Sequence, residues 1–499
     1  MLFGFNVNPT LINIFCGCLI VWLIKYLFNF INRIHKLPPG PWGLPIVGYL
    51  PFIKKDAYIQ MTELAKKYGP VFSFKCGQFD VVVINGTELM KEALVNEQIL
   101  DRPKDFFTPG MTKIPSLVEM SGEVWRQQRR VALTIFRNVG LGKSKLEEKI
   151  KEEINFFTRK IDSFEGKKFN FDDLIHLSVA NVVSIILFGH RYDYEDPFAI
   201  EMANSLKKVN QNFHYFYGLT FLPSFYNFIS SLSFLSPNYK KMVQNQMQLE
   251  DKVTTEVKEH LEKGDSREIN DYIDGYLEAI NKQKGENNYS FNLETLRRNV
   301  ADFYAAGSDT IAATLKWIML YLVLYPECQQ RIQDEIKETI GSEREPEYAD
   351  RQQMPYTMAF LYESLRLSSI VALNVYRRAT RETHIAGYII PKDAFVVMNF
   401  WSVHRDPNLW DDPDSFKPER FLNEDGSKVV KSFNFFPFSA GKRVCPGENL
   451  SWMELFLYLV SILQKFRIAA PEGERISLES KFMFTISPKK PVELVCKRT

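Results

Sequence analysis

The chain has 499 residues, a net charge of +2 and 24% charged residues, so it lacks the strong basic field typical of nucleic-acid-binding proteins. Hydrophobic residues make up 45% of the sequence and include 40 Phe, which is enough for a large apolar core. Six cysteines are too few for a disulfide framework in a chain of this size, which is consistent with a reducing cytosolic environment.

The N-terminal segment predicts a membrane anchor. No charged residue precedes Lys25, and the apolar stretch continues beyond it to Ile31, which is close to the roughly 20 residues that span a bilayer. Lys25, Arg33 and Lys36 follow the apolar core, so the positive-inside rule places the rest of the chain in the cytosol. A cleaved secretory signal is the alternative, but the segment has no basic start and no small-residue cleavage site. We therefore expect 1–31 to be a single-pass signal anchor.

The anchor is followed by a linker and one large domain. Segment 32–48 is basic at first and then rich in proline and glycine, which predicts a stiff, non-helical linker. The remaining residues, 49–499, are expected to form a single catalytic domain that is mainly α-helical with a small β region. Helical patterns are found in 58–67, 144–164, 238–263, 293–325 and 326–340.

Two segments have the pattern of paired β-strands. Residues 71–85 alternate between apolar and polar and break at 76–78, which predicts a hairpin. Residues 384–398 are expected to form another strand pair that turns around Pro391 and Lys392.

Residues 122–130, GEVWRQQRR, place Trp125 and Arg129 four residues apart on one helical face. Taken alone, an exposed basic turn with one buried Trp explains the pattern equally well. Residues 213–235 are dense in aromatics, which fits the wall of a pocket but fits ordinary core or a membrane-facing surface at least as well.

The stretch 293–325 predicts a long buried helix, because apolar residues lie on all of its faces after Asp309. Its AGSDT segment places the acid Asp309 and the hydroxyl of Thr310 midway along that helix, where polar groups without partners are costly. A functional pair and an Asp309 with an ordinary buried partner are equally compatible with this pattern.

A second helix is expected to begin near Pro355 and to carry Glu363 and Arg366 three residues apart on one face. Such a pair is most often a solvated surface bridge that contributes about 0.2 to 0.5 kcal/mol. Further along, FKPERFL supplies another arginine, Arg420.

The most informative segment is FSAGKRVCPG, residues 438–447, which sets Cys445 in a glycine-flanked loop before an apolar helix. A thiolate is favoured at such a helix start, and glycines at 441 and 447 let backbone approach a flat cofactor. No second Cys or His lies nearby, which argues against a structural zinc site. A single thiolate fits an axial haem ligand better, and Arg443 could meet an anionic group of the same cofactor.

These motifs together resemble the cytochrome P-450 superfamily of haem-thiolate monooxygenases, in particular its microsomal animal-type members. The resemblance covers essentially the whole chain after the anchor. It implies the cytochrome P-450 fold and a haem b cofactor (iron protoporphyrin IX) whose iron takes Cys445 as axial ligand. It also implies that Thr310 and Asp309 are catalytic and help to deliver protons to bound dioxygen.

The resemblance assigns further positions. Trp125 and Arg129 would meet a haem propionate, and Arg377 would make another propionate contact, although the adjacent Arg378 could take that place. Glu363, Arg366 and Arg420 would form a buried structural triad beneath Cys445. The cofactor-binding residues expected in this way are Cys445, Trp125, Arg129, Arg377, Arg443, Phe438 and Ala306.

The substrate pocket is the least specified part. By family position it would be lined by the loop 106–117, the stretch 370–373, the aromatic segment 213–235 and the turn near Phe484. The candidates are Ile114, Phe213, Val371, Leu373 and Phe484. None of these positions offers a charged group that would hold a carboxylate, so we expect an apolar small molecule, which leaves xenobiotics, steroids and fatty acids open.

The predicted function is that of an endoplasmic reticulum monooxygenase that hydroxylates or epoxidises such a molecule. The chain has no GxGxxG strand-turn-helix, so electrons from NADPH would come through a separate NADPH-cytochrome P-450 reductase, with cytochrome b5 as an optional second donor. One alternative is a thiolate-haem isomerase or dehydratase acting on lipid peroxides, against which the presence of Asp309 and Thr310 weighs. The other is a non-enzymatic haem-binding protein.

Overall fold

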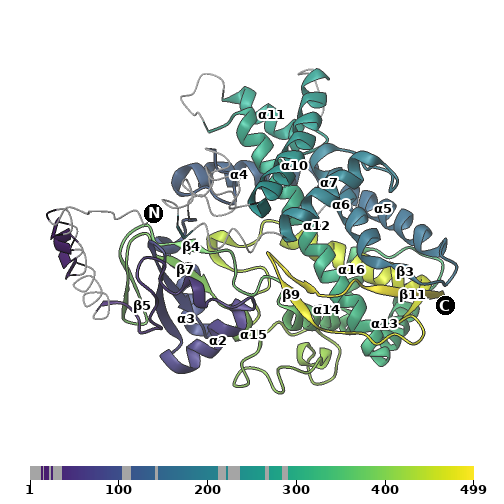
Figure 1. Ribbon diagram of the computed structural model, residues 1–499. Helices are drawn as coiled ribbons and strands as arrows, with labels where there is room; N and C mark the ends of the chain where they lie inside the picture. Colours follow the sequence, from purple (N-terminus) through teal and green to yellow (C-terminus); the bar gives the residue numbers. More distant parts are fainter. Residues whose placement is uncertain are drawn as a thin grey trace, which may run out of the picture.

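The structure is a computed structural model in which helices dominate, with a β-rich region at one side and further short strands near the C-terminus at the other (Figure 1). It describes residues 36–103, 114–140, 144–211, 221–222, 237–263, 269–283 and 290–499, together with short helical pieces between 10 and 25. The prediction of a mainly helical fold with a small β region is confirmed.

The helices account for most of the described chain. They are α2 (Ala57–Tyr68), α3 (Thr87–Val95), α4 (Gly122–Val139), α5 (Ser144–Asp162), α6 (Phe171–Phe188), α7 (Pro197–Gln211), α10 (Pro237–Glu262), α11 (Tyr272–Lys282), α12 (Leu293–Leu324), α13 (Pro326–Thr339), α14 (Pro355–Ser368), α15 (Phe400–His404) and α16 (Glu448–Lys465).

The strands form four small sheets. The largest has the order β1 (Val71–Cys76), β2 (Phe79–Ile84), β7 (Phe395–Met398) and β4 (Arg377–Arg378). A second joins β3 (Phe169–Asn170), β11 (Glu493–Arg498) and β8 (Phe466–Ala469), and the two-stranded sheets are β5 (Thr383–Ile385) with β6 (Tyr388–Ile390) and β9 (Ser480–Phe482) with β10 (Ile486–Pro488).

The hairpin predicted in 71–85 is present as the antiparallel pair of β1 and β2. A strand pair is also present within 384–398, but the prediction that it turns around Pro391 and Lys392 is wrong. The hairpin of β5 and β6 turns at Ala386 and Gly387, which have φ angles of 52° and 78° and so form the tight left-handed turn that hairpins favour. The strand after Pro391 instead pairs in parallel with β2.

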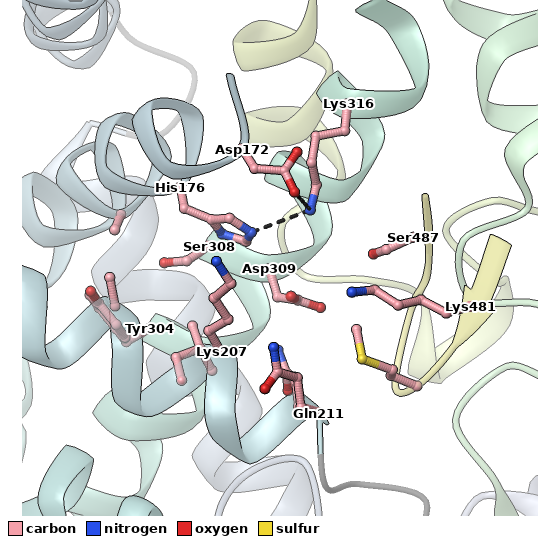
Figure 2. Close-up of a pocket in the computed structure, with 15 residues that line it drawn as sticks. Asp172, His176, Lys207, Gln211, Tyr304, Ser308, Asp309, Lys316, Lys481 and Ser487 are labelled. Carbon is pink, nitrogen blue, oxygen red and sulfur yellow. Dashed lines mark hydrogen bonds and ion pairs between the residues drawn. The ribbon is translucent and has the colours of Figure 1, made fainter. Parts of the chain in front are cut away.

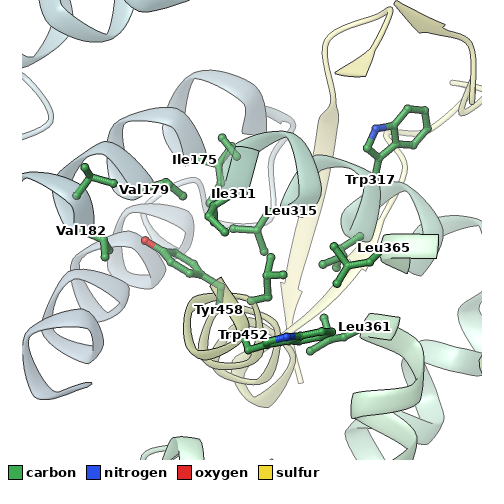
Figure 3. Close-up of a cluster of buried hydrophobic side chains, with 14 of the residues drawn as sticks. Ile175, Val179, Val182, Ile311, Leu315, Trp317, Leu361, Leu365, Trp452 and Tyr458 are labelled. Carbon is green, nitrogen blue, oxygen red and sulfur yellow. The ribbon is translucent and has the colours of Figure 1, made fainter. Parts of the chain in front are cut away.

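The core lies where α12 packs against α6, α14 and α16 (Figure 3). These helices are apolar on most faces because each is surrounded by others, so they lack the single apolar stripe of a surface helix. Gly307 permits the close approach of α12 to α6, since a Cβ there would lie 2.8 Å from Cγ2 of Val183. This contact keeps the middle of α12 fixed in the centre of the molecule.

Two described helices, α6 and α12, are long and apolar enough to cross a membrane, but 78% of each apolar window is buried inside the protein, as expected of core helices. The predicted anchor, 1–31, lies largely outside the described residues. The apolar side chains that are described there, Ile14, Ile20, Val21 and Ile24, are exposed on helical backbone. The anchor therefore stays a prediction.

Candidate active site

Cys445 lies in a tight loop that leads into α16. Its backbone N–H donates to the carbonyl of Phe438 at 3.0 Å, which closes the loop on itself. Gly441 has a φ of 72°, and a Cβ there would lie 2.5 Å from the backbone oxygen of Leu94 in α3. A glycine is therefore required at position 441 by the turn and by the contact with α3. The sequence had suggested another reason, close approach of the backbone to a flat cofactor.

The thiol of Cys445 opens on an enclosed cavity of about 230 Å³, here called the Cys445 cavity. From α12 it is lined by Ala306 and Thr310, and Ala306 is exposed to it although α12 is otherwise largely buried. Its other predicted site residues are Trp125, Arg129, Phe438, Arg443, Val371 and Phe484.

Three arginines, Arg102, Arg129 and Arg443, line this cavity, and the buried Arg377 lies close enough to repel two of them. Burial and repulsion from Arg443, Arg377 and Arg129 hold the pKa of Arg102 well below its usual range. Burial and the neighbouring guanidiniums likewise lower the pKa of Arg443 to about 9, and burial lowers that of Arg377 to about 10. Among the described residues, none of the four forms an ion pair with a carboxylate, so the cluster lacks negative charge.

Backbone carbonyls and one aromatic ring hold the cluster in place. Arg102 donates through Nη1 to the carbonyls of Val375 and Tyr376 at 2.6 and 2.9 Å. Arg443 donates through Nε to the carbonyl of Leu100 at 2.9 Å, and its Cζ lies 3.8 Å from the ring centroid of Trp125. Because the guanidiniums are fixed before any ligand arrives, the site is preorganised for anionic groups.

Arg377, and not its neighbour Arg378, belongs to this cluster. Arg377 is almost fully buried and donates to the carbonyl of Ala440 in the cysteine loop at 3.4 Å, and its Nε has no hydrogen-bond partner among the described residues. Arg378 instead pairs with Asp101 and Asp393 at 3.0 and 2.6 Å. Arg377 contacts the cysteine loop but is not among the residues that line the Cys445 cavity, so its propionate contact stays a prediction.

Arg102 was missed at the sequence level. It precedes Pro103 in no recognisable motif, and its place in the site depends on contacts with residues more than 270 positions away. The loop 106–117 was predicted to line the pocket, and Leu117 does line the Cys445 cavity. Its anchor to α12 was missed: the backbone N–H of Leu117 donates to Asn299 Oδ1 at 2.7 Å, and the hydroxyl of Ser116 donates to Asp302. Asn299 and Asp302 are three residues apart in α12, a polar pair on a buried helix that could have signalled this anchor.

Asp309 and Thr310 face different spaces. The Thr310 hydroxyl donates to the carbonyl of Ala306 at 2.7 Å and lines the Cys445 cavity. The Asp309 carboxylate accepts a hydrogen bond from Thr485 at 2.8 Å and lines a separate, polar cavity, here called the lysine cavity. Burial raises the pKa of Asp309, while Lys316 and Thr485 oppose that rise.

Glu363, Arg366 and Arg420 meet beneath the site. Arg366 donates to both carboxylate oxygens of Glu363 at 2.7 Å, and Arg420 reaches the same carboxylate at 3.2 Å. Glu363 and Arg366 are completely buried, unlike a surface i, i+3 pair. Arg366 also donates to the backbone carbonyls of His404 and Pro413, so the triad ties α14 to the segment that precedes the cysteine loop.

The predicted substrate-pocket residues are only partly brought together. Val371 and Phe484 line the Cys445 cavity. Leu373 lines a neighbouring cavity of about 810 Å³, here called the large apolar cavity, because the chain turns between residues 370 and 373. Ile114 lines none of these three cavities, and Phe213 lies outside the described residues.

The hairpin of β9 and β10 separates the three cavities. Phe484 in its turn lines the Cys445 cavity, whereas the preceding Met483 lines both the lysine cavity and the large apolar cavity. Lys481 also lines these two, and Thr485 holds Asp309.

The donor set fits a haem. A flat cofactor with two carboxylates would supply the negative charge that the four arginines lack, and its iron would stabilise the thiolate of Cys445, whose pKa burial raises. The fold and site thus define a haem-thiolate protein.

Comparison with known proteins agrees with this class. The family model for Cytochrome P450 matches residues 38–495. Cytochrome P450 2J2 of Homo sapiens is 36% identical over 466 residues, which cover 92% of this chain and 90% of that protein. Cytochrome P450 2E1 of Oryctolagus cuniculus is 36% identical over 463 residues (90% and 92%), and cytochrome P450 18a1 of Drosophila melanogaster is 32% identical over 494 residues (96% and 90%). The chain belongs to the cytochrome P450 family and is a monooxygenase of the oxidoreductase class.

Proposed function

We propose that this protein is a membrane-anchored haem b monooxygenase that hydroxylates or epoxidises an apolar small molecule. Its electrons come from NADPH through a separate NADPH-cytochrome P-450 reductase, with cytochrome b5 as an optional donor. The observation that carries the proposal is one cavity that combines the Cys445 thiol, a cluster of unneutralised arginines and the Thr310 hydroxyl.

The cofactor would be held at both its iron and its acidic groups. Cys445 would provide the sulfur ligand of the iron, and Arg102, Arg129 and Arg443, with Arg377 behind them, would neutralise the two propionates. When bound, haem supplies the iron centre that binds and reduces dioxygen. Arg129 also donates to the carbonyl of Val444 at 2.5 Å, so it links the propionate side to the cysteine loop.

Thr310 is the residue we assign to proton handling inside the Cys445 cavity. Its hydroxyl can hold a proton at Oγ1 at the cavity wall while Ala306 leaves open space one turn earlier. Asp309 supplies protons from the lysine cavity, on another face of the same helix. Its raised pKa favours the protonated form, which suits a proton donor.

The substrate would be held mainly by apolar contact. Leu117, Phe303, Ile311, Ile370, Val371, Leu455 and Phe484 line the Cys445 cavity. These side chains exclude water and orient a molecule without binding a specific polar group. The apolar walls therefore support a substrate such as a xenobiotic, a steroid or a fatty acid.

The cellular setting is part of the proposal. Segment 1–31 would anchor the protein in the endoplasmic reticulum membrane and 32–48 would connect it to the catalytic domain, 49–499, on the cytosolic face. The basic residues after the apolar segment support this orientation.

The decisive experiment is a carbon monoxide difference spectrum of the reduced protein, with Cys445→Ser beside it and Cys328→Ser as the control for loss of a buried thiol. A strongly red-shifted Soret band in the wild type and in the control, lost in Cys445→Ser, is the expected result. An unshifted wild-type band would contradict thiolate ligation. Substrate-dependent turnover with NADPH and reductase then separates the monooxygenase from a haem-binding protein, and turnover of a lipid hydroperoxide without reductase would favour the isomerase.

A further inference from the structure

The lysine cavity is enclosed by elements distant in sequence. It has a volume of about 40 Å³ and is bounded by α6, α7, α12 and the hairpin of β9 and β10. Figure 2 shows Lys207, Lys316 and Lys481 extending from three sides toward the space around Asp309. Three ammonium groups around a space large enough for a small ion are unusual in a protein interior.

The charges in this cavity are incompletely balanced. Lys316 is buried and lies 3.9 Å from Asp172 Oδ2, and it donates to His176 Nε2 at 3.3 Å. Burial and the three lysines hold the pKa of His176 well below its usual range, so the imidazole is neutral. Lys207 pairs with the exposed Asp173 at 3.1 Å.

Lys481 has no such partner. Among the described residues no carboxylate lies within 4.0 Å of its Nζ, and its ammonium makes no hydrogen bond. The two acids that line the cavity are already engaged, Asp172 by Lys316 and Asp309 by Thr485. Asp172 and Asp309 attract the Lys481 ammonium only from beyond ion-pair distance, while Lys316 and Lys207 repel it, so this half-buried charge favours a bound anion.

Two buried donors without a hydrogen-bond partner in the described part of the chain line the same cavity. The hydroxyl of Ser308 is 1% exposed and has no hydrogen-bond partner among the described residues. The amide of Asn210 is 8% exposed and lies near Asp309, but its Nδ2 makes no hydrogen bond of normal geometry. Buried donors of this kind are almost always satisfied in native proteins, by protein, water or a ligand.

We propose that the lysine cavity is an anion-binding site in which Lys481, Lys316 and Ser308 hold a small anionic group. The anion has two possible sources with the same chemistry. It is either a free halide-sized inorganic ion or the carboxylate of an amphipathic molecule whose apolar body occupies the large apolar cavity.

The second source follows from the residues that the two cavities share. Gln211, Lys481 and Met483 line both the lysine cavity and the large apolar cavity. The latter has a volume of about 810 Å³ and a largely apolar wall that includes Phe74, Phe221 and Phe482, which matches a site for a lipid-sized ligand. If the anion is a carboxylate, the ligand is an acidic, lipid-like substrate or effector of this enzyme. This second form of the proposal rests on the proposed function.

The test measures binding at equilibrium, without NADPH or reductase, on the full-length haem-loaded protein. Its failure is therefore distinguishable from a failure of the proposed oxygenation. In one arm the gluconate of the buffer is replaced by chloride at constant ionic strength, and the melting temperature of the protein is measured. The other arm measures binding of dodecanoate and of 1-dodecanol, an uncharged analogue, by equilibrium dialysis.

The variants are Lys481→Gln, which removes the charge, and Lys481→Arg, which keeps it. Lys489→Gln is the matched control, because Lys489 lines only the large apolar cavity and pairs with Glu479 at 3.0 Å at the surface. These lysines are partly exposed, so each variant is expected to fold, and haem content verifies this.

A chloride-dependent rise in melting temperature that is lost only in Lys481→Gln identifies an inorganic ion. An affinity for dodecanoate that falls about tenfold in Lys481→Gln and recovers in Lys481→Arg, with 1-dodecanol unaffected, identifies a carboxylate; this factor corresponds to one lost charge-assisted hydrogen bond. If neither probe distinguishes Lys481→Gln from Lys489→Gln, the cavity holds only water and the proposal is overturned.

Discussion

Asp309 and Thr310 are consecutive residues of α12, yet their side chains line different cavities. Successive residues of an α-helix are rotated by about 100°, which here turns the acid toward the β9–β10 side and the hydroxyl toward Cys445. Asp309 therefore makes no direct contact with a ligand of the Cys445 cavity. The two residues have separable roles, and their variants should behave differently.

Thr310→Ala is expected to uncouple the enzyme. Loss of the hydroxyl removes the proton-holding group from the Cys445 cavity, so NADPH is consumed and hydrogen peroxide released while product formation falls by about 10²-fold. NADPH oxidation, peroxide and product are measured together. Ser364→Ala, on α14 with a hydroxyl that makes the same kind of bond to the carbonyl of Phe360 but outside the Cys445 cavity, is the control and should stay coupled. Tight coupling in Thr310→Ala would remove the proposed role.

Asp309→Asn is expected to slow turnover without weakening substrate binding. The carboxyl lies outside the Cys445 cavity, so the dissociation constant of a substrate, measured from its spectral shift, should not change. Turnover should fall by about 10²-fold, with an increased solvent deuterium isotope effect, because a proton donor is lost. Weaker substrate binding with an unchanged isotope effect would show that Asp309 is only structural.

Arg102→Leu is expected to weaken haem retention. Its guanidinium is fixed by two backbone carbonyls beside three other arginines, so its loss removes one charge-assisted contact to a propionate. Such contacts contribute about 1.5 to 3 kcal/mol, which corresponds to a haem dissociation rate about 10 to 100 times faster. Transfer of haem to an excess of apomyoglobin measures this rate. Arg126→Leu, exposed on α4 and paired with Glu123, should release haem at the wild-type rate.

Gly307→Ala is expected to destabilise the fold by about 1 to 3 kcal/mol, the usual cost of overpacking a core. The added Cβ would lie 2.8 Å from Cγ2 of Val183, where α12 and α6 are in contact. Thermal unfolding of the haem-loaded protein gives the comparison. The double variant Gly307→Ala with Val183→Ala should recover part of the lost stability. If the double variant is no more stable than Gly307→Ala, the strain does not come from the contact with Val183.

The buried pair of His260 and Asp271 predicts a pH dependence of stability. Burial opposes the charge of His260, but its 2.9 Å contact with Asp271 outweighs burial and raises the pKa of His260 above the ordinary 6.5. A raised folded-state pKa stabilises the fold fully below the unfolded-state value, and this contribution is lost as the pH rises through the folded-state value. Between about pH 6 and pH 9, the wild type should therefore lose more of its melting temperature than His260→Gln. Equal losses in both proteins would contradict this assignment.

Local motifs could be predicted from the sequence because their residues are fixed by short-range spacing. The cysteine loop before α16 and the Glu363–Arg366 pair on α14 are of this kind. Arg102 could not be predicted, because only the packing of segment 375–376 against it brings it to the site.

The direction of side chains was the other feature that the sequence could not predict. Val371 and Leu373 were assigned to one pocket, but the chain turns at residues 370–373 and the two side chains line different cavities. The expectation that no charged group could hold a carboxylate came from considering only the loops around the Cys445 cavity. Lys207, Lys316 and Lys481 come from three separate elements, and their convergence is a property of the tertiary fold.

The hairpin of β9 and β10 has a consequence for how this enzyme can diversify. Residues 481–485 line the three cavities and hold Asp309, so a change of a few adjacent codons alters the space beside Cys445, the lysine cavity and the support of the acid together. A mutation in this hairpin is therefore expected to change substrate preference and the efficiency of oxygen use together. A transplant of this hairpin from a relative would be expected to change both at once.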